Sequence, residues 1–155
     1  MTKGSAVTSH TYTYDKANQI STINGSAVTH DKNGNLINDG KRIYIYDAED
    51  RLIEVKEGTS SIATYEYNSQ GLRTSKTIGG NSTYYTYDEN DNVVLETDKS
   101  GKVMASYVYD NENKPMTMTR DGKTYTFHSN ARGDITTVTD EQSTVVASFE
   151  YDSWG

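Results

Sequence analysis

Residues 44–55 read YIYDAEDRLIEV, and this stretch contains the pattern that is repeated through the rest of the chain. Tyr44 and Tyr46 are separated by one residue and followed by an aspartate. Because residues two apart point to the same face of a strand, the two rings are expected on one side of a strand. Asp50 tolerates the left-handed backbone of a tight turn, and Leu52 then begins an apolar stretch. The stretch therefore predicts a β-hairpin.

The same pattern returns along the chain at intervals of 16 to 24 residues, which is typical of a repeat protein. The first aromatic position is held in successive copies by Tyr12, Val28, Tyr44, Tyr65, Tyr85, Tyr107, Tyr125 and Phe149. The second is held by Tyr14, His30, Tyr46, Tyr67, Tyr87, Tyr109, Phe127 and Tyr151. The residue after it is Asp15, Asp31, Asp47, Asn68, Asp88, Asp110, His128 or Asp152. Twelve of the 13 tyrosines thus occupy two columns, and only Tyr84 lies outside them.

Two turn signals separate the strands of each copy. Four residues after the second aromatic position, the chain has residues that tolerate a left-handed backbone, namely Asn18, Gly34, Asp50, Gly71, Asp91, Asn113 and Gly155, with Gly133 two residues late in the seventh copy. The preceding aspartate is expected to accept backbone N–H groups as an Asx-turn. A glycine-containing signal closes most copies, at residues 24–25, 39–40, 57–58, 79–80, 100–101 and 121–122.

An apolar residue stands six positions after the second aromatic residue in most copies. Ile20, Leu36, Leu52 and Val93 hold this position and are expected to begin the return strand, whereas Arg73 and Pro115 break the pattern. Strands joined in sequence by short turns build an antiparallel meander. We therefore predict an all-β protein with almost no helix, made of a continuous antiparallel meander of hairpins that forms a curled or spiral sheet.

The two faces of this sheet are expected to differ in polarity. One face would be lined by tyrosine, leucine, isoleucine and valine, and the other by threonine, serine, lysine and glutamate. Residues 1–155 are interpreted as one repeat array with about seven full repeats and a partial eighth at 147–155. Since the last copy opens a hairpin without its return strand, the chain is expected to be a fragment of a larger protein. Its open sheet edges favour self-association.

Composition alone leaves two interpretations open. Only 25 of the 155 residues are leucine, isoleucine, valine or phenylalanine, a share below the roughly 20% under which a highly charged chain is usually disordered. The register of the tyrosines favours a folded sheet instead, because a disordered chain has no reason to place its rings in columns. The aromatic rings then replace aliphatic side chains in a thin core.

Charge and residue usage exclude several classes of protein. The formal net charge is −7 and no Lys/Arg cluster is longer than Lys41-Arg42, so a nucleic-acid interface is not expected. The absence of cysteine rules out disulfides and Cys-ligated metals. No apolar run is long enough to span a membrane, and no signal peptide is visible. No cofactor is expected.

Candidate chemical sites in the sequence all coincide with repeat positions. His10, His30 and His128 are separated by whole repeats, so no metal or catalytic site is expected from them. His128, Ser129 and Asp134 lack the pattern of a hydrolytic group. The segments at residues 31–35 and 88–92 resemble the start of a calcium loop but lack its sixth-position glycine and twelfth-position glutamate. We interpret both as turns, and the aromatic columns as packing residues rather than sugar-stacking platforms.

The columns resemble the tyrosine–aspartate (YD) or Rhs repeat. Residues 44–55 give the clearest copy, and residues 65–73 resemble another common form. Residues 125–140 and 147–155 are similar to the segment that leads into the Rhs-associated core, which precedes a variable C-terminal toxin. His30, Asn68, His128 and Pro115 depart from the consensus.

This resemblance implies a function as well as a fold. YD repeats in this family wind into a hollow shell that encloses a toxic polypeptide in Rhs proteins and insecticidal toxin complexes, and a related shell occurs in teneurins. The composition is similar to wall-associated Rhs-type proteins linked to contact-dependent inhibition. The resemblance thus implies a non-enzymatic shell segment of a secreted or cell-surface bacterial protein, whose partners are the remaining repeats and a C-terminal toxin beyond Gly155. A surface module that binds a glycan or a protein through its tyrosine face is the alternative.

Overall fold

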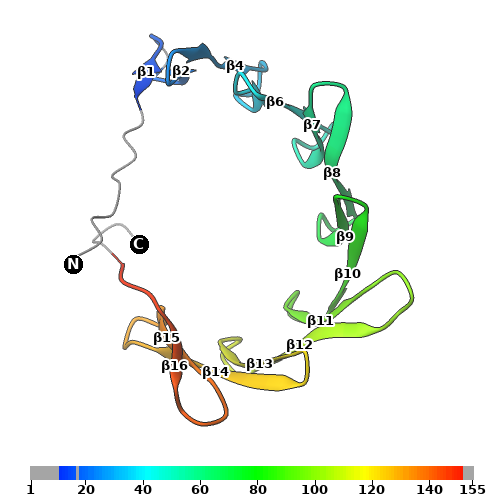
Figure 1. The fold of residues 1–155 in the computed structure, drawn as a ribbon, viewed down its shortest axis with the longest axis vertical. Coiled ribbons are helices and arrows are strands. Elements are labelled where there is room, and N and C mark those ends of the chain that lie inside the picture. Colours follow the sequence, from blue (N-terminus) through cyan, green and yellow to red (C-terminus); the bar gives the residue numbers. More distant parts are fainter. Residues whose placement is uncertain (1–10, 17, 152–155) are drawn as a thin grey trace, which may run out of the picture. The chain divides into compact units, whose positions relative to one another are not determined.

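The computed structural model describes residues 11–16 and 18–151, which form sixteen β-strands and no helix (Figure 1). The chain divides into two compact units, one made of Met1–Glu66 with Thr77–Gly79 and the other of Tyr67–Lys76 with Gly80–Gly155. In the described part of the chain, no helix is present that could cross a membrane. The all-β prediction is therefore confirmed.

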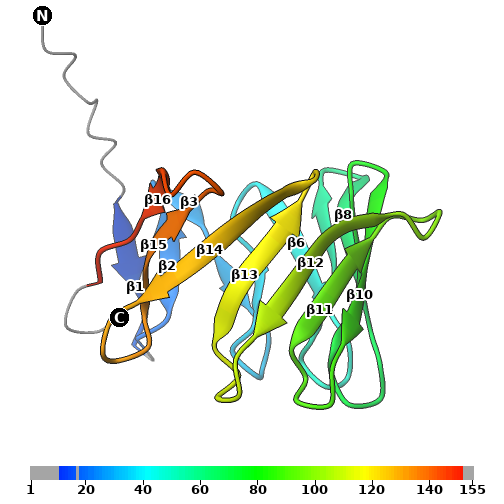
Figure 2. The same cartoon turned by 90° about the horizontal axis from the view of Figure 1, so that it is seen from below.

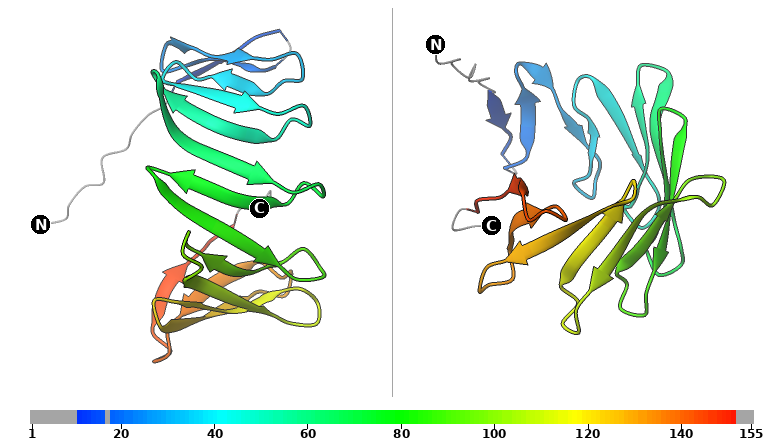
Figure 3. Two further views of the ribbon diagram at one scale, coloured as in Figure 1. Left: turned by 90° about the vertical axis from the view of Figure 1, so that its right-hand side faces the viewer. Right: turned by 60° about the horizontal axis from the view of Figure 1, so that its bottom comes forward.

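The first unit contains two antiparallel sheets in which neighbouring strands follow chain order. The smaller sheet consists of β1 (Tyr12–Tyr14), β2 (Ile20–Ile23) and β3 (Ser26–Ala27). The strands of the larger one that belong to this unit are β4 (Thr29–His30), β5 (Leu36–Asn38), β6 (Arg42–Tyr46), β7 (Leu52–Glu57) and, as far as Glu66, β8 (Ser60–Tyr67). The turns of these hairpins alternate between the two ends of the strands (Figure 3). The predicted hairpin of residues 44–55 is the pair of β6 and β7.

The second unit contains an antiparallel meander of seven consecutive strands among its described residues. They are β10 (Asn81–Tyr87), β11 (Val93–Thr97), β12 (Val103–Tyr109), β13 (Pro115–Arg120), β14 (Lys123–Ser129), β15 (Ile135–Thr139) and β16 (Val145–Ser148). Strand β9 (Arg73–Ile78) contributes residues to both units. Figure 2 shows β10 to β14 lying side by side, each rotated relative to its neighbour, as right-handed strand twist requires. The predicted antiparallel meander is thus confirmed.

Each return strand is paired through a β-bulge that follows one rule. In β6 and β7, Tyr46 pairs with Leu52 and Tyr44 pairs with Val55. A step of two residues along β6 is therefore matched by a step of three residues along β7. The same register shift occurs between β1 and β2, β4 and β5, β10 and β11, β12 and β13, and β14 and β15. The return-strand residues on the tyrosine face are therefore three apart, namely Ile20 and Ile23, Leu52 and Val55, Val93 and Glu96, Pro115 and Met118, and Ile135 and Val138.

The bulge corrects the predicted separation of polar and apolar faces. A bulge reverses the alternation of side chains between the two faces. Leu95 consequently pairs with Thr86 and Ser106 on the hydroxyl-rich face, whereas Glu96 pairs with Tyr85 on the tyrosine face. The expectation that leucine lines the tyrosine face and glutamate the opposite face is therefore wrong for Leu95 and Glu96.

The core is thin and consists mainly of small side chains. The buried apolar residues are Val28, Val55, Ala63, Ala105 and Val138, together with the polar Ser75. No large side chain among the described residues is completely buried. The tyrosines of the columns between Tyr44 and Tyr125 are half-buried. Neighbouring strands, rather than a second layer, therefore supply most of the burial in each unit.

Candidate functional site

The turn that follows the second aromatic position is a compact hydrogen-bonded loop. At Asp31, the backbone N–H donates to the carbonyl of Asn35 over 2.9 Å, and the N–H of Gly34 donates to the carbonyl of Asp31 over 3.2 Å. The Asp31 Oδ1 atom accepts the backbone N–H groups of Asn33 and Asn35, each over 2.9 Å. Gly34 has a φ of 91°, a conformation that glycine adopts without strain. The side chain thus fixes the loop that joins two strands.

This loop recurs with the same backbone hydrogen bonds throughout the described residues. It begins at Asp15, Asp31, Asp47, Asn68, Asp88, Asp98, Asp110, Asn130 and Asp140. The fourth residue of each loop has a positive φ, and these residues are Asn18, Gly34, Asp50, Gly71, Asp91, Gly101, Asn113, Gly133 and Ser143. The loops at Asp98 and Asp140 join the opposite ends of their strands, and the sequence reasoning did not assign them to this type. Their spacing of an aspartate and a glycine or serine three residues later was the available signal.

The seventh copy differs from its sequence alignment. Asn130, rather than His128, begins the loop, since its N–H donates to the carbonyl of Asp134 over 2.9 Å. Ser129 pairs with Ile135, and Phe127 pairs with Val138. The assignment of Phe127 and His128 to the second aromatic and aspartate positions is therefore wrong by two residues. The late Gly133 reflects aromatic residues that stand two positions earlier on a strand of ordinary length, since β14 has seven residues, as β10 and β12 do.

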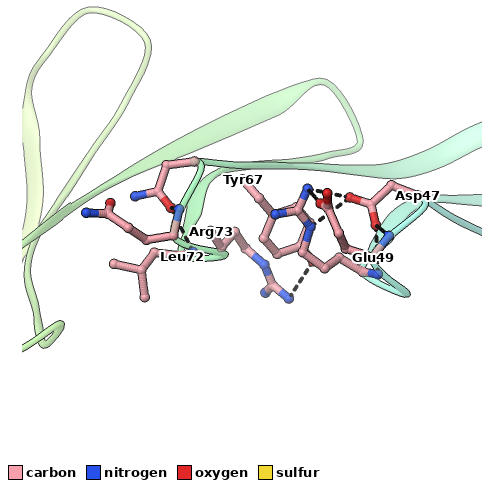
Figure 4. A network of polar contacts seen from close by, with 8 residues as sticks. Asp47, Glu49, Tyr67, Leu72 and Arg73 are labelled. Carbon is pink, nitrogen blue, oxygen red and sulfur yellow. Dashed lines mark hydrogen bonds and ion pairs between the residues drawn. The ribbon is translucent and has the colours of Figure 1, made fainter.

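The loop carboxylates have low pKa values because they accept hydrogen bonds. The side chain of Asn35 lowers the pKa of Asp31, and the side chain of Asn92 does the same for Asp88. Burial raises the pKa of Asp47, but hydrogen bonds from Arg51 outweigh this effect and lower it overall. Figure 4 shows Asp47 and Glu49, which both pair with the guanidinium group of Arg51, and Arg73 beside Tyr67. Each of these aspartates is thus held in its charged form.

Acidification is expected to unfold the chain progressively. The pKa values of Asp31, Asp47, Asp88, Asp98 and Asp110 are lowered from the ordinary value of 3.8, so the unfolded chain takes up protons first as the pH falls. The loops contribute their full stability above 3.8 and lose it as the pH falls through the lower folded pKa values. The midpoint of urea unfolding, followed by circular dichroism, should fall in this range.

Asparagine supplies a control for this acid dependence. Asn68 and Asn130 form the same loop without a titratable group. The variant Asp88→Asn should therefore keep the loop at neutral pH and reduce the slope of stability against pH below 3.8. An unchanged slope in this variant would show that the loop carboxylates do not control acid unfolding.

The hydroxyl groups of the second aromatic column connect successive repeats. Tyr46 donates to the carbonyl of Leu36 over 3.1 Å, and Tyr109 donates to that of Val93 over 3.0 Å. Tyr87 donates to Arg73 and Tyr151 to Ile135, each over 2.8 Å. Every acceptor is the first residue of the return strand in the preceding repeat. These rings therefore pack on one hairpin while their hydroxyl groups bind its backbone.

The sites proposed from the sequence are distributed over the tyrosine face and the loops. Tyr12, Tyr14, Phe149 and Tyr151 are exposed, and the remaining described aromatic residues of the two columns are half-buried. Asp152 and the end of the partial eighth repeat lie outside the described residues, as does His10. A position missed by the sequence reasoning lies two residues before the first aromatic position, where Ala63, Ala105 and Ala147 continue the alternation on the same face.

A charged cluster occupies the tyrosine face of the second unit. Glu96 Oε1 accepts the hydroxyl of Tyr107 over 2.8 Å, and Glu96 Oε2 accepts Nη2 of Arg120 over 2.8 Å. Burial, followed by the hydrogen bond to Glu96, raises the pKa of Tyr107 to about 12. Ala105 pairs with both Glu96 and Arg120, and it is only 1% exposed. The ion pair therefore spans the strand β12 above a small side chain.

A cavity of about 380 Å³ borders this cluster within the second unit. Its charged lining residues are Lys76, Lys102 and Arg120, together with Glu96, Asp98 and Asp121. Glu96 is already paired with Arg120 and Tyr107, and Asp98 Oδ1 accepts N–H and O–H groups of its own loop. The equal numbers of positive and negative groups favour no single class of charged ligand.

The remaining candidate groups take part in local hydrogen bonds. The oxygens of Asp31 and Asp88 accept backbone and asparagine side-chain N–H groups within their own loops. His128 Nε2 lies 2.9 Å from Thr139 Oγ1, and Asp134 accepts a bond from Asn130. In residues 11–16 and 18–151, no group of three His, Cys, Asp or Glu side chains is arranged to hold a metal ion.

Comparison with known proteins gives one family and several relatives. The family model described as teneurin YD-shell matches residues 2–155. The tRNA3(Ser)-specific nuclease WapA of Bacillus spizizenii is 46% identical over 89 residues, which are 56% of this chain and 4% of that protein. The tRNA nuclease WapA of Bacillus subtilis is 44% identical over a segment of the same length. The chain therefore spans only a small part of the curated relatives it matches.

A solved structure supports the fold assignment. The chain is similar to the protein in the crystal structure of TcdB2-TccC3-Cdc42, with a TM-score of 0.53 and 17% sequence identity. The similarity covers 74% of this chain and 7% of that one. At this identity, the likeness concerns the arrangement of the strands and not the activity.

Proposed function

The chain belongs to the teneurin YD-shell family, and from this membership we propose that it is a non-enzymatic wall segment of a larger secreted bacterial protein. In this proposal, residues 1–155 are one repeat array whose curled sheet forms part of a hollow shell. The shell encloses a C-terminal toxin, and the remaining repeats and that toxin are the partners of the segment. The parent protein acts at the bacterial surface in contact-dependent inhibition.

The observation that supports this proposal most strongly is the use of the repeated side chains. The tyrosine hydroxyl groups bind the backbone of the preceding repeat, and the aspartates of the columns bind their own loops. Because these side chains form hydrogen bonds within the sheet, further repeats can be added to it in the same way. Few of their polar groups then remain available for a chemical reaction. A wall that excludes proteases and solvent by its backbone and packing needs no reactive group.

The relatives support a separation between a toxic activity elsewhere in the parent protein and enclosure by this segment. The WapA proteins are named as nucleases, and the 89 residues of this chain that match them correspond to 4% of their length. We assign a nuclease or other toxic activity of the parent protein to a part outside this segment. The segment itself contributes enclosure by steric exclusion.

Protease protection of the parent protein tests enclosure. The C-terminal region should survive limited proteolysis within the parent and be digested when it is expressed alone. A protease recognition sequence inserted between Asp121 and Gly122, an exposed turn, should abolish protection after cleavage. The same insertion in a linker outside the repeats is the matched control. Equal digestion of the C-terminal region alone and within the parent would contradict the proposal.

Binding of a glycan or protein through the tyrosine face is the second candidate function. Among the described residues, the exposed aromatic side chains of Tyr12, Tyr14, Phe149 and Tyr151 support it, since stacking on sugars needs open ring faces. Saturable binding on a glycan array that disappears in a Tyr12→Ala/Tyr14→Ala variant would favour it. Self-association through the strand β16, where Val145 and Val146 are exposed, is tested by light scattering at several concentrations.

A further inference from the structure

Two Asn-Gly sequences lie in the first unit, at Asn24-Gly25 and Asn33-Gly34. An asparagine before glycine is chemically labile, because the unhindered glycine nitrogen reaches the side-chain amide carbon more easily than the nitrogen of any other residue. The two sequences share this intrinsic reactivity. Their different hydrogen bonds allow the structure to distinguish them.

The surroundings of Asn24 favour the reaction. The backbone N–H of Thr11 donates to Asn24 Oδ1 over 2.9 Å. Negative charge develops on this oxygen when a nucleophile adds to the amide carbon, and a fixed N–H donor stabilises such charge. The N–H of Gly25 has no hydrogen-bond partner among the described residues, and no atom lies within 4 Å of the position that a Cβ on Gly25 would occupy. The attacking nitrogen is therefore accessible.

The surroundings of Asn33 oppose the reaction. The N–H of Gly34 donates to the carbonyl of Asp31 over 3.2 Å, so the attacking nitrogen is engaged in the loop. Asn33 Nδ2 donates to Asp50 Oδ1 over 2.8 Å. This contact holds the amide in place and places a carboxylate, rather than a donor, beside it. Addition at Asn33 requires both contacts to break.

We propose that Asn24 is a site of spontaneous hydrolytic modification and that the structure protects Asn33. The Gly25 nitrogen forms a bond to Asn24 Cγ and loses its proton, while the side-chain nitrogen leaves as ammonia. Water then opens the resulting five-membered succinimide ring to give aspartate or isoaspartate. The amide becomes a carboxylate, so the net charge of −7 becomes one unit more negative.

The isoaspartate product changes the small sheet of the first unit. Asn24 lies in the two-residue turn between β2 and β3, where Ile23 pairs with Ser26. Its own N–H donates to the carbonyl of Thr11 over 2.8 Å. Isoaspartate routes the main chain through the side-chain carbon and lengthens the turn. The product is therefore expected to weaken the pairing of β3 with β2 and of residue 24 with residue 11.

Peptide mapping of the aged chain tests this proposal. The intact chain is incubated in mildly alkaline buffer, and ammonia loss at each asparagine is followed by mass spectrometry and by labelling with isoaspartate methyltransferase. Because the N–H of Gly34 is engaged in its loop and the N–H of Gly25 is not, Asn24 is expected to react about tenfold faster than Asn33. In concentrated urea, the ratio should fall to about one, since both sequences are then equally exposed. Equal rates in the native chain, or a faster reaction at Asn33, would overturn the proposal.

Substitutions at Thr11 provide a second test. Thr11→Pro removes the N–H that donates to Asn24 Oδ1 and lies before an edge strand, where proline is tolerated. Thr11→Ala retains that N–H and is the matched control. The proline variant should slow the reaction at Asn24 about fivefold, and the alanine variant should leave it unchanged. Circular dichroism checks that both variants keep the sheet. Unchanged modification in a folded proline variant would contradict the role of Thr11.

Discussion

Replacing Ala105 by leucine is expected to lower the free energy of unfolding by about 1–3 kcal/mol. Ala105 is 1% exposed and pairs with Glu96 on one side and Arg120 on the other. A larger side chain at this position pushes against the ion pair that lies above it, in which Arg120 Nη2 and Glu96 Oε2 are 2.8 Å apart. The substitution therefore adds steric strain and separates a partly buried ion pair in one step.

The change is measured as the shift in the midpoint of urea unfolding, followed by circular dichroism. Val108→Leu is the matched control, because Val108 lies on the same strand but is 55% exposed. This control should change stability by less than about 0.5 kcal/mol. A folded Ala105→Leu variant with unchanged stability would show that β12 has free space above this residue.

Replacing Tyr107 by alanine is expected to cost about 2–4 kcal/mol, the second large effect. The ring is half-buried and pairs across the sheet with Met118, and its hydroxyl donates to Glu96. Its removal exposes apolar surface and leaves one Glu96 oxygen without this partner. Urea unfolding of the variant measures both losses together.

Tyr84→Ala is the control that isolates the effect of column position. Tyr84 is also a tyrosine on a strand, but it lies outside the two columns and is 42% exposed. Its removal should cost about 1 kcal/mol or less. Similar costs for the two variants would contradict a special role of the columns. A Tyr107→Phe variant separates the hydroxyl from the ring and should lose about 1 kcal/mol.

The strands and turns of this chain follow closely from its sequence. Tyr44, Tyr46 and Asp47 predict a hairpin because side-chain direction in a strand and the φ of a turn are local properties. The left-handed backbone at Asp50, with a φ of 60°, is observed where the spacing placed it. Regular loops therefore make the fold class readable from a single copy of the repeat.

The faces of the return strands could not be predicted in the same way. The bulge opposite Tyr87 places Val93 and Glu96 on one face, although they are three residues apart. Strict alternation would put them on opposite faces, so the ion pair of Glu96 and Arg120 was not expected. Once the bulge is known, an apolar residue nine positions after the second aromatic residue becomes a recognisable signal, as at Val55.

The seventh copy shows a second limit, which concerns predicting the position of a loop from the aromatic columns. The sequence has an aromatic residue at the expected position 127, but the loop begins at Asn130 because only that residue has glycine three positions later. Turn geometry, rather than the aromatic residue, sets the register. The additional loops at Asp98 and Asp140 form without any tyrosine before them, and their positive φ lies at Gly101 and Ser143, three positions later.

The tyrosine hydroxyl groups give the array a direction. In each recorded case the donor lies in a later repeat and the carbonyl acceptor in the repeat before it, as for Tyr109 and Val93. A ribosome releases the acceptor first, as part of a hairpin closed by its own local loop. Each newly synthesised repeat can therefore dock on a finished neighbour without waiting for downstream sequence. Such an array is suited to vectorial folding during translation, in which the repeat folded last provides the carbonyl acceptor for the next repeat.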